Sequence, residues 1–324
     1  MKYILSSFLI AFLFSACSSK QYFEPKETTT IPKNIIDIPA YIKNINSEGA
    51  TLEDNRFIDK HGISSKKLQD GFYFLNNNNS DIISANKLGD LTINGNLHFK
   101  FKSRVIAASL NGELLALTFA DNSIALYNIK DQEFKFKKYL KVSYLNDTRI
   151  AMPLFLNYLV LFPTLDGKVI IVNTIKFTLA KTMTIDPNSQ VNNIILLKNI
   201  QDNLIIASSN TMLSISNQKA YKKRFFIQSY TTDDEFVYIA TLDGKLLKLS
   251  ATLDIVAFKK FRFAKFEALT VKDGNLYAIE SQGFIVKLDP TFTKVEVDEI
   301  SFEDDENTFS SKNKIYFENK LITF

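Results

Sequence analysis

The stretch Asp234–Ser250, DEFVYIATLDGKLLKLS, is an apolar run, an Asp-Gly pair and a second apolar run. Asp-Gly supplies the two residues with positive φ that a type I′ turn needs, so the stretch predicts a β-hairpin. The runs Val237–Ala240 and Val169–Val172 are continuously apolar rather than alternating. This pattern is typical of strands that are covered on both faces, as the inner strands of packed blades are.

The same hairpin recurs along the chain. Equivalent turn positions lie between 34 and 45 residues apart, which is the period of a four-stranded propeller blade. These positions are Ser80, Asn122, Gly167, Asn210, Gly244, Gly283 and Asn319. We therefore predict an all-β, seven-bladed β-propeller, with six or eight blades left open where the spacing drops to 34. A β-sandwich has a similar strand spacing but does not account for seven copies of one hairpin.

The two ends of the repeat predict how the ring closes. The last copy, Lys314–Phe324, contains only a hairpin, so its blade lacks an outer strand. The segment Ala50–Lys60 precedes the first full blade and has no blade of its own. We expect this N-terminal strand to complete the last blade, because pairing the two ends of the chain removes an open edge.

The N-terminus carries the features of a secreted lipoprotein. Met1–Phe14 is a short positive start and an apolar run, too short to span a bilayer comfortably. It leads into Ser15-Ala16-Cys17, which resembles the bacterial lipobox, although Phe14 stands where that family prefers Leu. The resemblance implies a signal peptide over residues 1–16 and lipidation of Cys17. An ordinary signal peptide with a chance cysteine is the alternative.

Residues 17–50 are predicted to form a flexible tether. They hold three of the seven prolines, and the fully extended segment would reach roughly 110 Å. Its apolar piece Ile35–Ile45 is expected to dock on its own domain or on a partner. The propeller is then predicted over residues 51–324. Cys17 is the only cysteine, so no disulfide can stabilise it.

No residues with the spacing of a catalytic or metal site are found in the sequence. The two histidines, His61 and His98, have no partner at metal-ligand spacing, and there is no Gly-x-Ser-x-Gly motif or phosphate loop. A triad assembled in space stays open. We interpret Asp166-Gly167 and Asp243-Gly244 as turns rather than calcium loops. We expect no catalytic residue, no cofactor, no metal and no small-molecule substrate.

The charges are balanced overall but unevenly placed. Lys and Arg number 39 against 35 Asp and Glu, and a net charge of +4 gives no support for a nucleic-acid partner. The predicted outer strands carry basic residues over most of the rim and acidic ones near the closure. The basic set is Lys135, Lys137, Lys138, Lys222, Lys223, Arg224, Lys259, Lys260 and Arg262. The acidic set is Glu53, Asp54, Glu296, Asp298 and Glu299. Such a rim serves solubility and edge protection, or recognises a partner or anionic lipid.

Two hairpins, LYAIESQGFIVKLD and VYIATLDGKLLKLS, look like the repeats of pyrroloquinoline-quinone-type propellers. The best matches are Leu276-Tyr277-Ala278, Leu288-Asp289-Pro290 and Thr241–Leu249. The lipid-anchored, non-enzymatic branch of that superfamily is the BamB-like scaffold of the outer-membrane β-barrel assembly machinery. The chain lacks the tryptophans of the quinone-dependent dehydrogenases, which disfavours an enzyme.

The resemblance implies a non-enzymatic scaffold, anchored in the outer membrane and facing the periplasm, that binds envelope proteins. Ser18, which follows Cys17, resembles lipoproteins sent to the outer membrane. Two alternatives stay open: a propeller enzyme or carbohydrate-binding protein that uses the central channel, and a scaffold of another envelope machine.

Overall fold

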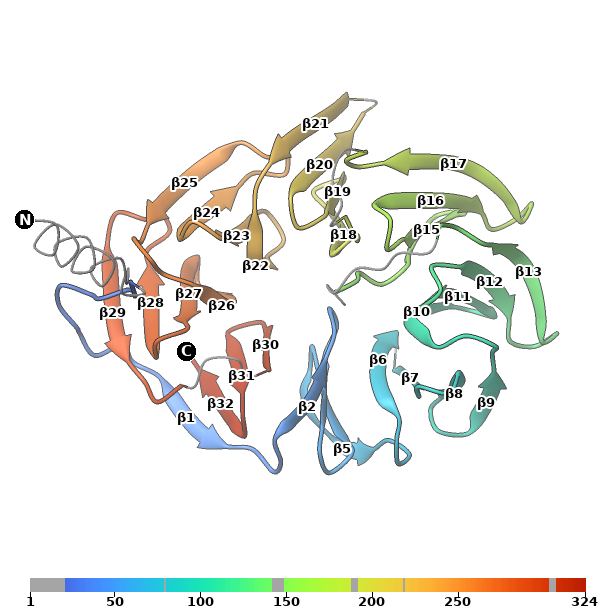
Figure 1. Ribbon diagram of the computed structural model, residues 1–324, viewed down its shortest axis with the longest axis horizontal. Helices are drawn as coiled ribbons and strands as arrows, with labels where there is room; N and C mark the ends of the chain where they lie inside the picture. The colour runs from blue at the N-terminus through green and yellow to red at the C-terminus, as the bar shows by residue number, and fades with distance from the viewer. Residues whose placement is uncertain (1–20, 79, 142–148, 188–191, 218, 303–306) are drawn as a thin grey trace, which may run out of the picture.

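A computed structural model describes residues 21–78, 80–141, 149–187, 192–217, 219–302 and 307–324. Within these residues the chain forms eight four-stranded antiparallel sheets, arranged as blades around a central axis (Figure 1). The predicted all-β propeller is confirmed. Its blade number is eight, which the sequence left open, and the favoured count of seven was wrong.

Each blade runs from an inner strand at the axis to an outer strand at the rim. Blade 1 consists of β2 (Ile42–Ile45), β3 (Ala50–Leu52), β4 (Arg56–Asp59) and β5 (Gly62–Lys67). Blade 2 consists of β6 (Tyr73–Asn78), β7 (Asp81–Ala85), β8 (Asp90–Ile93) and β9 (Leu97–Lys100). Blade 3 consists of β10 (Val105–Asn111), β11 (Leu114–Phe119), β12 (Ile124–Asn128) and β13 (Glu133–Lys138). Blade 4 consists of β14 (Leu154–Leu156), β15 (Leu159–Pro163), β16 (Lys168–Asn173) and β17 (Thr178–Thr184).

The second half of the ring repeats this order. Blade 5 consists of β18 (Leu196–Ile200), β19 (Asn203–Ala207), β20 (Thr211–Ser216) and β21 (Lys219–Arg224). Blade 6 consists of β22 (Ile227–Thr232), β23 (Val237–Thr241), β24 (Lys245–Leu249) and β25 (Ile255–Lys260). Blade 7 consists of β26 (Phe266–Lys272), β27 (Asn275–Glu280), β28 (Phe284–Leu288) and β29 (Val295–Glu299). Blade 8 consists of β30 (Thr308–Ser311), β31 (Lys314–Phe317), β32 (Lys320–Thr323) and β1 (Asn34–Asp37).

The ring is closed by the N-terminal strand β1, which pairs antiparallel with β32 from Asn34 opposite Thr323 to Asp37 opposite Lys320. An N-terminal strand therefore completes the last blade, as predicted, but the predicted residues were wrong. Ala50–Lys60 instead forms β3 and β4 in the middle of blade 1. The true closing strand is four exposed residues, NIID, so burial imposes no apolar pattern on it.

Blade 1 was missed because its second and third strands are short, three residues in β3 and four in β4, so Ala50–Lys60 was predicted to be a single strand. Asn55 has φ 70°, as Gly244 has φ 76°, and asparagine tolerates the left-handed region better than most residues. The first predicted repeat was also one strand out of register. Ser80 lies between the first and second strands of blade 2, whereas Gly89 occupies the turn equivalent to Gly244.

The predicted boundary at residue 51 also requires correction. The strands β1 and β2 both lie inside the segment 17–50 that was predicted to be a tether. Ile31 and Ile38 in the same segment are buried between blades. The apolar piece Ile35–Ile45 thus docks on its own domain, which is one of the two outcomes expected for it.

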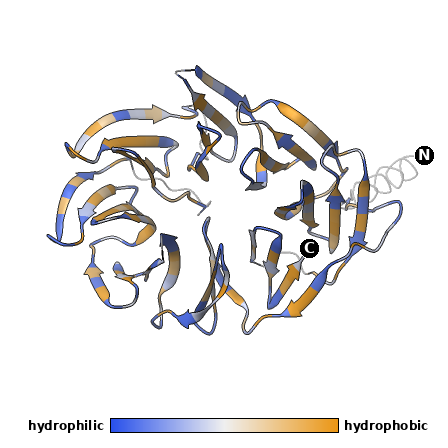
Figure 2. Ribbon diagram, turned by 180° about the vertical axis from the view of Figure 1, so that it is seen from behind, coloured by the Kyte–Doolittle hydropathy of each residue, from blue (hydrophilic) through white to orange (hydrophobic). Residues whose placement is uncertain are grey.

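The hydrophobic core is divided among the seams between neighbouring blades. At the seam of blades 6 and 7, for example, Tyr238 and Leu246 meet Leu276 and Val286 in one buried cluster. Figure 2 shows the apolar residues concentrated on the blades and the polar ones toward their tips and turns. Burial of each large apolar side chain contributes about 1.5–3 kcal/mol, so adjacent blades stabilise one another and no blade is expected to be stable alone.

Candidate interaction surface

Each blade ends in an outer strand with one edge of backbone N–H and C=O groups that no further strand of its sheet pairs. Such an edge binds another extended chain unless charge, brevity or a covering segment prevents it. The edge of β29 is covered, because Thr29 donates its N–H to the carbonyl of Val297 (2.6 Å). Of the other outer strands, β17 is the longest, with seven residues.

The strand β17, TLAKTMT, contains one charged residue, Lys181. Six of its seven residues are exposed, and the Leu179 side chain is 43% exposed. Ile175, in the turn before the strand, is 63% exposed. The outer edge of blade 4 therefore offers an extended, nearly uncharged backbone beside exposed apolar side chains.

The pairing of β17 with β16 fixes which of its backbone groups face outward. Ile185 donates its N–H to the carbonyl of Gly167 (2.9 Å), and Met183 lies opposite Val169 in the same register. Along an antiparallel strand, backbone N–H groups that bond to the neighbouring strand alternate with N–H groups that point away from it. The N–H of Met183, two residues before Ile185, therefore also points toward β16. The N–H groups of Thr182 and Thr184 therefore point away from the sheet, where a partner strand could accept them.

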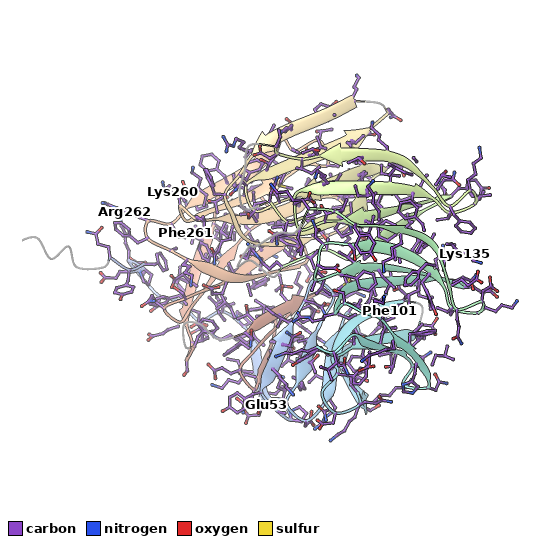
Figure 3. The ribbon with its side chains drawn as sticks, turned by 45° about the vertical axis from the view of Figure 1, so that its right-hand side comes forward. Glu53, Phe101, Lys135, Lys260, Phe261 and Arg262 are labelled. Carbon is purple, nitrogen blue, oxygen red and sulfur yellow. The ribbon has the colours of Figure 1, made fainter. Side chains whose placement is uncertain are left out.

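The other long outer strands are charged. The strand β21, KAYKKR, carries four cations over six residues, and β13, EFKFKK, carries three lysines. On β13 the Lys137 ammonium lies over the rings of Phe134 (4.8 Å) and Tyr139 (5.0 Å). The predicted basic residues thus lie on the rim or in the turn just after it. Figure 3 shows Lys135 and the pair Lys260 and Arg262 on opposite sides of the ring.

The predicted acidic sector divides into two places. Glu53 and Asp54 lie in the β3–β4 turn of blade 1 rather than on a closing strand, and Asp54 pairs with Arg56 (2.6 Å). On β29, Glu296 pairs with Lys287 (2.8 Å) and with Lys294 (2.5 Å). Asp298 likewise forms an ion pair with Lys33, on the segment that covers this edge. Cations of the same chain therefore neutralise much of the acidic charge.

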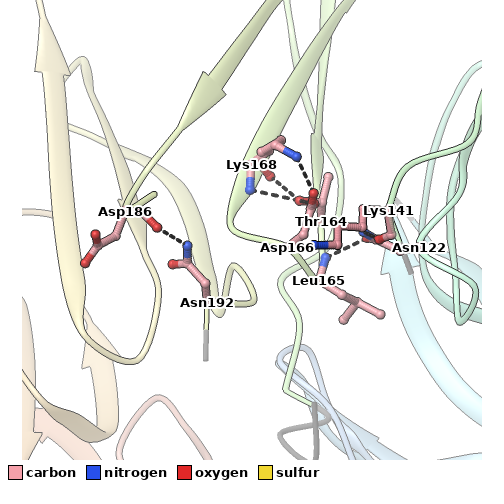
Figure 4. Close-up of polar contacts among 8 residues, drawn as sticks. All are labelled: Asn122, Lys141, Thr164, Leu165, Asp166, Lys168, Asp186 and Asn192. Atoms are coloured by element: carbon pink, nitrogen blue, oxygen red, sulfur yellow. Dashed lines mark hydrogen bonds and ion pairs between the residues drawn. The ribbon is translucent and has the colours of Figure 1, made fainter. Parts of the chain in front are cut away.

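The carboxylates of the two Asp-Gly turns are occupied by their own turns. The Asp243 carboxylate accepts a hydrogen bond from Thr241 (2.6 Å) and pairs with Lys245 (2.7 Å). The hydrogen bonds from Lys245 and Thr241 lower the pKa of Asp243 to about 2. Asp166 makes the equivalent contacts with Thr164 and Lys168 (Figure 4). These contacts support the interpretation of both motifs as structural turns.

The two histidines line separate pockets. His61 lies in a cavity of about 230 Å³ at the seam of blades 8 and 1, with Lys312, Lys314 and Tyr316. Its backbone N–H donates to Asp59 (2.7 Å). His98 lines another pocket on blade 2 with Asp90. Among the described residues, no three His, Cys, Asp or Glu side chains are grouped so that they could hold a metal ion.

Charged residues of blades 1 and 5 come near one another. Desolvation raises the pKa of Glu48, in the β2–β3 turn, against the lowering effect of Lys198 and Lys60, although the residue itself is exposed. Burial, and then the charge of Glu48, raise the pKa of Tyr230 on β22. The Tyr230 hydroxyl donates to the carbonyl of Ile195 (2.7 Å), which fixes it to blade 5. The Tyr230 hydroxyl thus joins blades 6 and 5.

The predicted lipidation site, Cys17, lies outside the described residues. Within those residues, no helix has the length and apolar composition needed to cross a bilayer. Sequence reasoning also missed Phe23, which is 7% exposed and packs edge-to-face on Phe261 (5.8 Å) and Phe284 (5.6 Å). One aromatic residue in a proline-rich segment gives no periodic signal, so only tertiary packing could reveal this contact.

The chain was also compared with known proteins. No family model matches it. Two relatives from Helicobacter pylori, strains J99 and 26695, are both named plasminogen-binding protein PgbB. Each is 24% identical to this chain in an alignment that covers 98% of this chain and 70% of the relative.

Solved structures share the fold at low identity. BamB from Moraxella catarrhalis superposes with a TM-score of 0.66 and 12% identity, over 91% of this chain and 99% of BamB. The C-terminal WD40 domain of Sif2 gives a TM-score of 0.60 and 13% identity, over 91% of this chain and 99% of that domain. The chain therefore has a BamB-like propeller fold, without specific support for the quinone-type repeat. The two PgbB relatives are named for binding plasminogen, and the solved structures establish the fold alone.

Proposed function

We propose that this protein is a periplasmic scaffold, anchored in the outer membrane through a lipid on Cys17, that acts by binding proteins rather than by catalysis. In the finer form of this proposal it serves outer-membrane β-barrel assembly, as a BamB-like component. The observation that carries the proposal is the open edge of β17. This edge is long, exposed and almost free of the charges that blunt β13 and β21.

The mode of binding that this edge supports is strand addition. A partner segment in extended conformation would accept hydrogen bonds from the N–H groups of Thr182 and Thr184. Backbone hydrogen bonds of this kind provide affinity, and alternate side chains provide specificity. Leu179 and Ile175, both exposed, would contact apolar side chains of the partner.

The test replaces Thr182 by proline. Proline removes the outward N–H and leaves the inward hydrogen bonds of Met183 and Lys181 to β16 in place. The matched control is Lys222→Pro on β21. Phe225 donates its N–H to the carbonyl of Asn210, so Lys222, three residues earlier, has an outward N–H by the same alternation.

Pull-down from detergent-solubilised envelopes measures the outcome. The unchanged protein and Lys222→Pro are expected to retain their partner, and Thr182→Pro is expected to lose at least about tenfold in affinity, or roughly 1.4 kcal/mol. Equal retention by both variants contradicts strand addition at β17. Failure to recover the barrel-assembly machinery contradicts the BamB-like part, and another envelope complex in its place supports the alternative machine.

The lipid anchor has its own test. Cys17→Ala is expected to be released as a soluble periplasmic protein, because it lacks the proposed lipid and, among the described residues, no helix could cross the bilayer. Fractionation of the envelope measures this release. A variant that stays in the membrane fraction in the absence of the Cys17 thiol contradicts lipidation at this residue.

Plasminogen binding is a second candidate, favoured by the two PgbB relatives that align with 98% of this chain. Binding of the purified protein to immobilised plasminogen tests it directly. If plasminogen binds and Thr182→Pro does not weaken it, a surface other than the β17 edge is responsible.

A further inference from the structure

The described chain is fixed to the propeller from its first residues. Phe23 is buried between blades 6 and 7 against Phe261 and Phe284. Farther along, Thr29 hydrogen-bonds to β29 and Ile31 is 1% exposed. The point at which the propeller holds its N-terminal segment is therefore Phe23, rather than residue 51.

This contact limits how far the propeller can lie from a lipid on Cys17. Phe23 follows Cys17 by six positions, and six fully extended residues span at most roughly 20 Å. A tether of 33 residues would have allowed roughly five times that reach. A lipid on Cys17 therefore holds one particular corner of the ring, where blades 6 and 7 meet, close to the membrane.

The surface at this corner combines exposed aromatic, aliphatic and basic side chains. We call it the anchor patch, and it consists of Tyr22, Phe226, Leu242, Lys260, Arg262 and Phe263. Its parts are contiguous, because Leu242 donates its N–H to the carbonyl of Phe226 (2.9 Å) and Phe261 donates to that of Gly244 (2.8 Å). Figure 3 shows Lys260, Phe261 and Arg262 together on one side of the ring.

The chemistry of the anchor patch matches that of a membrane interface. The Arg262 guanidinium lies over the Phe263 ring at 4.6 Å, and the half-exposed Lys260 ammonium lies 3.4 Å from Asp243. Aromatic rings are favoured at headgroup level, and basic side chains are attracted to anionic lipids. A lipid chain combined with a basic surface holds a protein more firmly than either does alone.

We infer that the anchor patch lies directly on the anionic phospholipid surface and sets the orientation of the propeller. This inference rests on the proposed lipidation of Cys17. In this orientation blades 6 and 7 are at the membrane, and β17, on the other side of the ring in Figure 1, is directed away from it. The edge proposed to bind a partner is then accessible from the periplasm.

The experiment places a spin label at one of two positions with equal exposure. Leu242 in the anchor patch and Tyr158 on blade 4 are both 66% exposed. Cys17 is the only native cysteine and its thiol is consumed by lipidation, so Leu242→Cys and Tyr158→Cys each give one labelling site. The lipidated full-length variants are reconstituted in vesicles of phosphatidylethanolamine and phosphatidylglycerol, and collision with dissolved oxygen is compared with collision with an aqueous nickel complex.

The label at position 242 is expected to favour oxygen, and the label at position 158 the aqueous nickel complex. Adding K260E/R262E should make the label at position 242 as accessible to the aqueous nickel complex as the label at position 158. The substitutions K135E/K138E, on the far side of the ring, should leave the accessibility of position 242 unchanged. Vesicles of phosphatidylcholine alone should also leave position 242 wet.

Three negative results are distinguishable. A protein that is absent from the membrane overturns both the lipid anchor and the orientation. A protein that is held in the membrane with position 242 as wet as position 158 overturns the orientation alone. An equally dry position 242 on phosphatidylcholine overturns the role of anionic lipid.

Discussion

Blades 4 and 5 are neighbours in one ring, yet they protect their outer edges in different ways. The strand β21 of blade 5 carries four cations, whereas β17 of blade 4 carries only Lys181. Their turns between the second and third strands also differ. Blade 4 uses Thr164–Lys168, with a glycine and an ion pair, and blade 5 uses the shorter Ser208–Thr211. The repeat thus preserves the fold of each blade, and the differences between copies indicate where function lies.

Removing the charges of β21 should have the largest effect on this contrast. We expect K222T/K223T/R224T, which leaves Lys219 as the one cation of β21, to make the purified protein self-associate, because a second edge with little charge becomes available for strand pairing. Light scattering of the purified protein measures the change. The control K60T/K312T/K314T removes the same charge from residues at the seam of blades 8 and 1. Equal association of the control would mean that net charge, and not the edge, keeps the protein apart.

The turn of blade 4 should be far less tolerant of substitution than that of blade 5. Gly167 has φ 73°, and a Cβ there would lie 2.1 Å from the Asn192 amide nitrogen. Gly167→Ala should therefore cost about 1–3 kcal/mol, through backbone strain and displacement of Asn192 from its hydrogen bond to Asp186. Ser209→Ala in blade 5 should stay within about 0.5 kcal/mol, because the buried Ser209 hydroxyl has no hydrogen-bond partner. Urea unfolding of the two variants measures the difference, and equal costs would contradict it.

The same turn residues explain how much of the fold the sequence predicts. Gly167, Gly244 and Gly283 occupy equivalent turns with positive φ, and Asn122, Asn210 and Asn319 lie in the same turn of three other blades, so a repeat of turn residues locates most blades correctly. Asn55 occupies the same turn in blade 1, but its flanking strands β3 and β4 are only three and four residues long, and the repeat was therefore counted one blade short. The closing strand β1 is exposed along its length, so burial did not select a pattern that could be recognised.

The candidate surface was only partly predictable. The basic outer strands follow directly from their lysines, because each lies at a fixed place after a hairpin. The open edge of β17 is distinguished by a lack of charged residues, and such a lack produces no sequence motif. It can be recognised only when β17 is compared with the charged strands β13 and β21. The contact of Phe23 with Phe261 joins residues more than 200 positions apart, so no local pattern could reveal it.

Acid should weaken the turn of blade 4 and leave that of blade 5 unaffected. Burial acts to raise the pKa of Asp166, but hydrogen bonds from Lys168, Thr164 and Asn122 outweigh it and hold the pKa below its ordinary value of 3.8. A carboxyl with a lowered pKa stabilises the fold above that ordinary value, and this contribution is lost as the pH falls through the folded pKa. Ser208–Thr211 contains no ionisable side chain.

The measurement compares the free energy of unfolding of the unchanged protein and Asp166→Asn as a function of pH. The unchanged protein should be the more stable at neutral pH, and the difference should shrink as the pH drops below about 4. Ser209→Ala serves as the control, with a difference that does not depend on pH. A gap for Asp166→Asn that stays constant down to strong acid would contradict the assigned role of this carboxylate.

The smallest effect is expected from the surface ion pair of blade 5. Lys223 on β21 lies 3.0 Å from Asp254 of blade 6, and the two side chains are 38% and 71% exposed. Water and salt screen such a pair, and side-chain entropy opposes it, so Lys223→Ala should change the unfolding free energy by less than about 0.5 kcal/mol. The Lys168–Asp166 pair of blade 4 is less exposed and shares its carboxylate with Thr164, so Lys168→Ala should cost more. Thermal unfolding of both variants at low and high salt tests this order. If Lys223→Ala proves the more destabilising, the cations of β21 stabilise the fold directly, and the view that they serve mainly to protect the edge is wrong.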